Sequence, residues 1–113
     1  MFRASLDTLV NSSDLLQEVS RKDLCAGDRL AVKTCNSVYT IRVEQNGLFS
    51  VSGGWFDRKS KSCSKMAILG CTWGGSAIKV DIVAACGLRI EFGNRVITSP
   101  IQKIFVFSRG VQN

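Results

Sequence analysis

The chain contains no histidine, a single proline and no run of about 20 apolar residues. Without histidine it lacks both the usual general base near neutral pH and the commonest metal ligand in proteins. Without a long apolar run, no segment is expected to cross a membrane as a helix. Four carboxylates follow residue 28: Glu44, Asp57, Asp81 and Glu91. The sequence gives no pattern that would bring one of them together with a base and a nucleophile in a catalytic site. We therefore predict a protein that is not an enzyme and carries no cofactor.

Five cysteines are present, and no two of them have the close spacing that is typical of zinc sites. The nearest pair, Cys63 and Cys71, is eight positions apart, so we predict no metal site. An odd count and an N-terminus without a secretory pattern favour free thiols in the cytoplasm. Cys71 and Cys86, which follow small residues, are expected to be buried, and Cys63 is expected to be exposed.

The length of 113 residues and the hydrophobic content of 45% predict one folded domain over residues 1–113. Residues 1–28 are predicted to form an N-terminal helical segment. Within it, a short helix is expected over residues 14–20, with Ser13 as its N-cap. The remaining residues, 29–113, are predicted to form a β domain.

From Arg29 onward, apolar and polar residues alternate with the period of two that is typical of half-buried strands. The apolar positions of these alternations are Leu30 and Val32; Tyr39, Ile41 and Val43; Ile78, Val80 and Ile82; and Leu88, Ile90 and Phe92. Residues 66–73 and 101–107 are apolar on both faces and are expected to be covered on both sides.

Two tight turns set the expected register of two hairpins. A three-residue loop, 45–47, with Gly47 in the left-handed region, pairs Val43 with Phe49 and Ile41 with Val51. A two-residue turn at 93–94 pairs Ile90 with Ile97. Short strands and tight turns predict a mainly β fold, a small antiparallel barrel or compact sandwich of about seven strands, with the helix over one open end. The alternative is an α+β roll, with the helix across an open sheet.

The net charge is +6, and residues 29–113 hold twelve bases against four acids. The one local cluster of bases, residues 57–65, directly follows two aromatic residues. Aromatic rings beside cations are typical of surfaces that bind single-stranded nucleic acid, because bases stack on rings while cations hold phosphates. We therefore predict a non-catalytic module for single-stranded nucleic acid or another polyanion, with these binding residues: Trp55, Phe56, Arg58, Lys59, Lys61, Lys65 and Trp73. The alternative is that both tryptophans anchor the core and the basic loop is simply solvated.

Two further functions fit the sequence. Self-association is one, because residues 101–107 form an apolar strand that would need cover at a sheet edge, with these contacts: Ile101, Ile104, Phe105 and Phe107. The same strand could instead lie inside the sheet. Carriage of a small ligand is the other, with an aromatic barrel mouth formed by Tyr39, Trp55 and Trp73 and an anion contact from Arg42 or Arg58.

Overall fold

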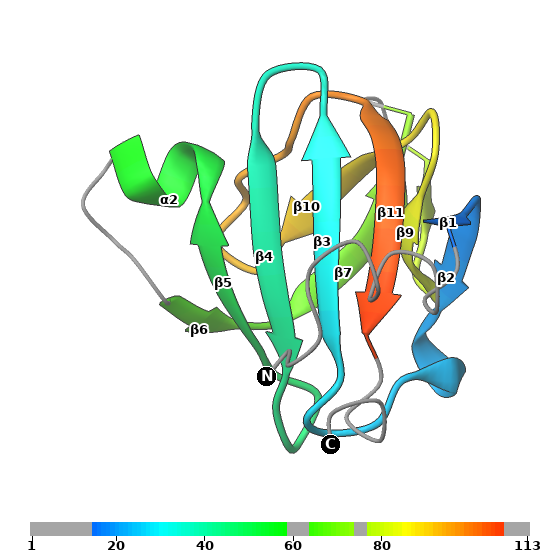
Figure 1. The fold of residues 1–113 in the computed structure, drawn as a ribbon, viewed down its shortest axis with the longest axis vertical. Helices are drawn as coiled ribbons and strands as arrows, with labels where there is room; N and C mark the ends of the chain where they lie inside the picture. Colours follow the sequence, from blue (N-terminus) through cyan, green and yellow to red (C-terminus); the bar gives the residue numbers. More distant parts are fainter. Residues whose placement is uncertain (1–14, 59–63, 74–76, 108–113) are drawn as a thin grey trace.

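The computed structural model describes residues 15–58, 64–73 and 77–107. The described chain is mainly β, with a short 3-10 helix and a short α-helix (Figure 1). The elements are β1 (Leu15–Leu16), β2 (Glu18–Ser20), η1 (Arg21–Asp23), β3 (Arg29–Thr34), β4 (Val38–Val43), β5 (Phe49–Gly53), α2 (Gly54–Arg58), β6 (Ser64–Met66), β7 (Ile68–Thr72), β8 (Ile78–Lys79), β9 (Ile82–Ala85), β10 (Arg89–Phe92) and β11 (Ile101–Phe107). The prediction of a mainly β, antiparallel, compact fold is confirmed.

The strands form three antiparallel sheets, with orders β1-β11-β3-β4-β5-β6, β10-β7-β8 and β2-β9. Two segments pass from the six-stranded sheet into the others. Strand β1 pairs with β11 and, one residue later, β2 pairs with β9. Likewise β6 pairs with β5, and β7 then pairs with β10 and β8. Within the described residues, the six-stranded sheet therefore ends at β1 and β6 and does not close on itself.

The prediction of a helix over residues 14–20 is wrong for the part that the structure describes, since residues 15–16 and 18–20 are strands. Val19 is 4% exposed because β2 pairs with β9, far along the chain. An apolar spacing that suits a helix also suits a short strand, and here long-range pairing decides.

The hairpin from β4 to β5 has the predicted register, with Ile41 opposite Val51 and Val43 opposite Phe49. Gly47 is left-handed at φ 76°, and its neighbour Asn46 is left-handed too, at 62°. Alternate residues of β4 and β5 share one buried face, which confirms that the apolar pattern sets this register.

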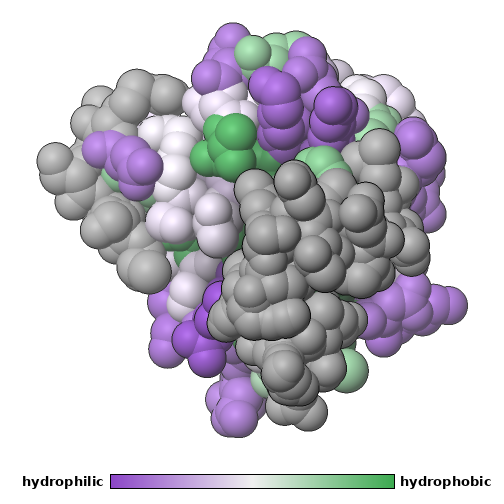
Figure 2. Space-filling model, viewed as in Figure 1, coloured by the Kyte–Doolittle hydropathy of each residue, from purple (hydrophilic) through white to green (hydrophobic). Residues whose placement is uncertain are grey.

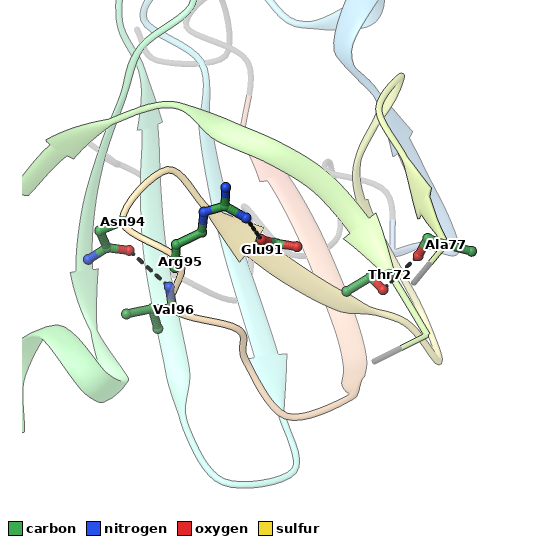
Figure 3. Close-up of polar contacts among 6 residues, drawn as sticks. All are labelled: Thr72, Ala77, Glu91, Asn94, Arg95 and Val96. Carbon is green, nitrogen blue, oxygen red and sulfur yellow. Dashed lines mark hydrogen bonds and ion pairs between the residues drawn. The ribbon is translucent and has the colours of Figure 1, made fainter. Parts of the chain in front are cut away.

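The register expected for the turn at 93–94 is wrong by one residue. Glu91, not Ile90, lies opposite Ile97, and Ile97 is 45% exposed. The loop holds three residues because Arg95 takes up the left-handed conformation, with φ 73°. Figure 3 shows the contacts that support it: the Val96 amide donates to Asn94 Oδ1 at 3.2 Å, and the guanidinium of Arg95 lies 3.4 Å from the Glu91 carboxylate.

The alternation expected through residues 78–82 is also interrupted. Ile78 and Val80 are 38% and 58% exposed, whereas Ile82 is buried. Strand β8 ends after two residues, and a turn at residues 80–81 separates it from β9. The hydroxyl of Thr72 donates to the Ala77 carbonyl at 2.7 Å where the chain enters β8 (Figure 3). The turn moves the chain to another strand partner, so the period of two does not continue through it.

The core lies behind the six-stranded sheet and is made by the inward residues of β3, β4 and β5 together with those of β7, β9 and β10. Three rings meet in it: Phe56 lies 5.2 Å from Phe92 and 6.2 Å from Tyr39, measured between ring centroids. The glycines Gly53 and Gly54 have φ of 94° and 48°, and a β-carbon on Gly54 would collide with the Tyr39 ring. The two glycines therefore let the chain turn sharply from β5 into α2, which inserts Phe56 into the core.

Candidate nucleic-acid interface

The predicted aromatic and basic loop is only partly within the described residues. Trp55 is half-buried, and its backbone N–H donates to the Tyr39 hydroxyl at 3.3 Å. Phe56 is fully buried, so its ring is not available for stacking on a ligand. Lys59, Lys61 and the side chain of Arg58 lie outside the described residues. Lys65 is exposed on β6 and is the predicted cation that the structure places.

Trp73 does not join Trp55 on one surface. Strand β6 pairs with β5, which places Met66 opposite Phe49. Strand β7 then pairs with β10 and β8 and ends on the side of the molecule away from α2 (Figure 1), and Trp73 directly follows its last residue. There Trp73 is 59% exposed, with the Lys79 ammonium 5.6 Å from its ring centroid.

The strand proposed for self-association lies inside the six-stranded sheet. Strand β11 pairs with β3 along one edge and with β1 on the other, where β1 lies opposite Ile104 and Phe105. Ile101 and Ile104 are 3% and 0% exposed in the core. Phe105 and Phe107 are half-buried on the opposite face of the sheet. The alternative stated for this strand, a place inside the sheet, is correct.

The aromatic mouth that a ligand carrier would need is not assembled either. Tyr39 is buried at 3% exposure, and Trp55 packs against the core. Trp73 follows β7, in a different sheet. The three rings therefore do not converge on one cavity.

The outer face of the six-stranded sheet, the face away from the core, carries a row of cations that crosses four strands. Strand pairing places Arg29 of β3 opposite Arg42 of β4, Arg42 opposite Ser50 of β5, and Ser50 opposite Lys65 of β6. Residues directly opposite each other in antiparallel strands project to the same face. With strands about 4.8 Å apart, the row is about 14 Å long.

A second pair of cations lies on the same face, four residues along β3. Lys33 is directly opposite Lys103 of β11, and both are exposed. At about 3.3 Å per residue, this pair is about 13 Å from Arg29 along the strand. We call the surface that carries the five cations the basic face; its cations are Arg29, Lys33, Arg42, Lys65 and Lys103.

Small residues form the floor between the two groups of cations. Ala31, Thr40 and Ser52 lie in one row across β3, β4 and β5. Figure 2 shows a pale, weakly polar area over β4 and β5, with hydrophilic residues below it. Phe105 of β11 continues this row opposite Ala31, and it is half-buried. Among the described residues, the floor is therefore low over β3, β4 and β5, where a polymer backbone can approach the sheet closely.

Two grooves lie along this surface. The face groove, of about 230 Å³, is lined by Arg29, Thr40, Arg42, Glu44, Ser50 and Ser52. The end groove, of about 500 Å³, lies by the turn between β4 and β5, where Arg42, Glu44 and Lys65 are joined by these residues: Ala26, Gly27, Val43, Gln45, Asn46 and Leu48. Arg42 and Glu44 line both grooves, so the two meet at these side chains.

Glu44 is the acid that lines the two grooves, and its carboxylate is held in place. Its Oε2 accepts a hydrogen bond from the Ser50 hydroxyl at 2.6 Å and lies 3.9 Å from Arg42 Nε. The Ser50 hydrogen bond lowers the pKa of Glu44 below its ordinary value, against a smaller opposing effect of desolvation, and the positive charge of Arg42 adds to the lowering. Glu44 is therefore ionised at neutral pH.

Sequence reasoning missed Arg29, Lys33 and Lys103 as binding candidates, and it considered Arg42 only for an anion at a barrel mouth. The alternation put Arg29, Lys33 and Arg42 on solvent-facing positions, and the correct β4–β5 register already implied that Arg42 faces Ser50. The missing information was the strand order, because β6 and β11 bring Lys65 and Lys103 to this face from distant segments.

Metal sites and membrane-spanning helices are absent from residues 15–58, 64–73 and 77–107. There, no group of three or more cysteine, aspartate or glutamate residues is placed to hold a metal ion. The helices in the same ranges are too short and too polar to span a bilayer. Comparison with known proteins gave no match to a family model, to a curated protein or to a solved structure.

Proposed function

We propose that this protein is a non-catalytic module that binds single-stranded nucleic acid across its basic face. The observation that carries the proposal is the gathering of five cations on one face of the sheet, with Lys33 directly opposite Lys103. Like charges directly opposite on neighbouring strands destabilise a sheet, whereas opposite charges stabilise it. A bound polyanion would relieve the repulsion between Lys33 and Lys103, because a phosphate would lie between the two cations.

The distance between the two groups of cations on the basic face supports a polyanion as the ligand rather than an isolated anion. The two groups of cations are about 13 Å apart, too far for one phosphate to reach both. A polymer with regularly spaced phosphates can reach both groups while it crosses the floor of Ala31, Thr40 and Ser52. The overall charge of +6 would draw such a polymer to the surface.

A single strand fits this surface better than a duplex. The major groove of a duplex admits a helix or a two-stranded ribbon, whereas the basic face spans β11, β3, β4, β5 and β6 of a six-stranded sheet. Modules for single strands commonly use a positively charged groove that follows the backbone, with a site of about 4–16 nucleotides. Binding of nucleic acid would suit the reducing cytoplasm, which we retain as the expected compartment.

The test is fluorescence anisotropy with a labelled dT oligonucleotide of about 12 nucleotides. The double variant Arg42→Gln with Lys65→Gln is compared with Lys22→Gln with Arg95→Asn. Both variants lose two positive charges, but Lys22 and Arg95 are exposed and line neither groove.

Loss of two phosphate contacts should weaken binding by roughly tenfold to thirtyfold at about 0.1 M salt, because fewer counterions are released. The control variant should stay within about twofold of the native protein, since long-range effects of exposed charges are screened at this salt. Equal losses in both variants would remove the basic face from the proposal, and no binding by the native protein at low salt would refute the function itself.

A further inference from the structure

We infer that the end groove holds one base of the bound strand and that the Glu44 carboxylate selects guanine. This inference rests on the proposed function. It starts from the continuity of the two grooves: Arg42 and Glu44 line both, so a strand in the face groove leads into the end groove. A volume of about 500 Å³ falls within the range of small-ligand pockets and accommodates a purine base with its sugar.

Glu44 is out of place on a surface that binds only phosphates. A fixed negative charge repels a polyanion and reduces its affinity, unless the carboxylate has another role. Pairing with Arg42 explains it poorly, because the nitrogen and oxygen are 3.9 Å apart, at the limit of an ion pair. The carboxylate is instead fixed by the short bond from Ser50, at 2.6 Å, which holds it at the junction of the two grooves.

The free acceptors of this carboxylate match one base better than the others. A carboxylate has two oxygens with about four lone-pair sites and donates nothing when ionised. Ser50 and Arg42 both approach Oε2, and within the described part of the chain Oε1 has no hydrogen-bond donor. Oε1, and the remaining lone pair of Oε2, can therefore accept two hydrogen bonds from a ligand.

Guanine presents two adjacent N–H donors, N1–H and the N2 amino group, on its pairing edge. The pairing edges of adenine and cytosine each place an acceptor beside the amino group, and thymine has a single N–H between two carbonyl oxygens. In these three cases an acceptor would face the carboxylate and repel it, which adds discrimination against the wrong base. Bonds from a bidentate side chain to a base discriminate against the wrong base by a factor of roughly 5 to 150 in other proteins.

The other residues of the end groove suit a base and its phosphate. Gln45 and Asn46 bring amide groups that can bond to further base atoms, and Leu48 offers a half-buried apolar contact. Ala26 and Gly27 have little or no side chain, so a flat ring can come close to the backbone. Lys65 lies on the same groove and can hold the adjoining phosphate.

The test compares dT oligonucleotides of about 12 nucleotides that differ at one central position: dT, dG, dA, dC or deoxyinosine. We expect the dG oligonucleotide to bind about tenfold more tightly than the all-dT oligonucleotide. Deoxyinosine lacks the N2 amino group, so most of that preference should be lost with it. This comparison needs no variant and cannot fail through misfolding.

Two variants assign the preference to Glu44. In Glu44→Gln, the ratio of dG to dT affinity should fall to about 1, because an amide presents one acceptor instead of two. In Glu91→Gln, a control whose carboxylate pairs with Arg95 outside both grooves, the ratio should be unchanged. Free dGMP should bind far more weakly than the dG oligonucleotide, since it lacks the contacts to the other cations.

The outcomes separate this inference from the proposed function. Equal affinity for all five oligonucleotides, or a preference for dG that survives Glu44→Gln, would overturn the guanine site while nucleic-acid binding stands. Free dGMP that binds as tightly as the oligonucleotide would overturn the placement of a strand across the two grooves. No binding of any oligonucleotide would overturn both.

Discussion

The salt dependence of nucleic-acid binding reports how many phosphate contacts the basic face makes. Its magnitude can therefore be predicted from the number of cations on that face. Five cations lie on this face, and each phosphate contact to a single strand contributes about −0.7 to the slope of log K against log salt concentration. If all five make a contact, the slope is about −3.5. Raising the salt from about 50 to about 200 mM should then weaken binding by roughly a hundredfold.

Replacement of Arg42 by glutamine tests this reasoning at one position. Arg42 is central because it lines both grooves, and its side chain is 56% exposed, so a phosphate can reach it. We expect the slope to fall from about −3.5 to about −2.8. Lys22→Gln removes the same charge from outside both grooves and should leave the slope unchanged.

The assay is anisotropy with the dT oligonucleotide at five or more salt concentrations for each protein. A native slope near zero would refute phosphate contacts on the basic face, because binding would then not depend on phosphates. Equal reductions of the slope by Arg42→Gln and Lys22→Gln would also refute them, since net charge rather than position would then decide.

Four further predictions concern stability and thiol chemistry. Lys33→Thr should raise the free energy of unfolding by about 0.2–1 kcal/mol, because it removes the repulsion from Lys103; a lower value in urea unfolding would argue against the repulsion. Gly53→Ala should lower it by at least about 1–3 kcal/mol, since φ is 94° and the new methyl group would collide with the Val38 carbonyl; an unchanged urea midpoint would contradict this. Burial raises the pKa of Cys71 from 9.0 to about 12, so its thiol should resist labelling at about pH 8 in the folded protein, and rapid labelling of the folded protein would disprove the burial. Because this pKa is higher when folded, the contribution of Cys71 to stability should be complete below about pH 9 and decline between about pH 9 and pH 12, as seen by urea unfolding at several pH values.

Local chemistry explains why part of the fold could be predicted from the sequence. The prediction of the β4–β5 register was correct because Tyr39, Ile41 and Val43 need a common buried face, and Gly47 accommodates the turn that provides it. The predicted register of the turn at residues 93–94 was wrong because Arg95 adopts a left-handed conformation that is uncommon for a residue other than glycine. Such a conformation depends on surrounding contacts and is not visible in the residue type.

Long-range pairing explains the larger errors. Residues 15–20 have an apolar spacing compatible with a helix, but they are strands because distant β11 and β9 pair with them. Phe56 was expected on the surface beside basic residues, whereas the turn at Gly53 and Gly54 directs it into the core. Neither outcome follows from a local pattern.

The candidate site was found only in part for the same reason. The sequence analysis identified a cluster of cations that includes Lys65, but it placed this cluster on a loop instead of on a sheet face. The basic face exists because β3, β4, β5, β6 and β11 are neighbours in one sheet. That order brings Lys103 opposite Lys33, seventy positions earlier in the chain.

The most direct test of the basic face is a titration of the isotope-labelled protein with the dT oligonucleotide, followed by amide chemical shifts. The face predicts that the largest shifts fall on Arg29, Arg42, Ser50 and Lys65, in four neighbouring strands. Shifts concentrated instead around Trp73, which follows β7, and Lys79 of β8, both outside the six-stranded sheet, would contradict it.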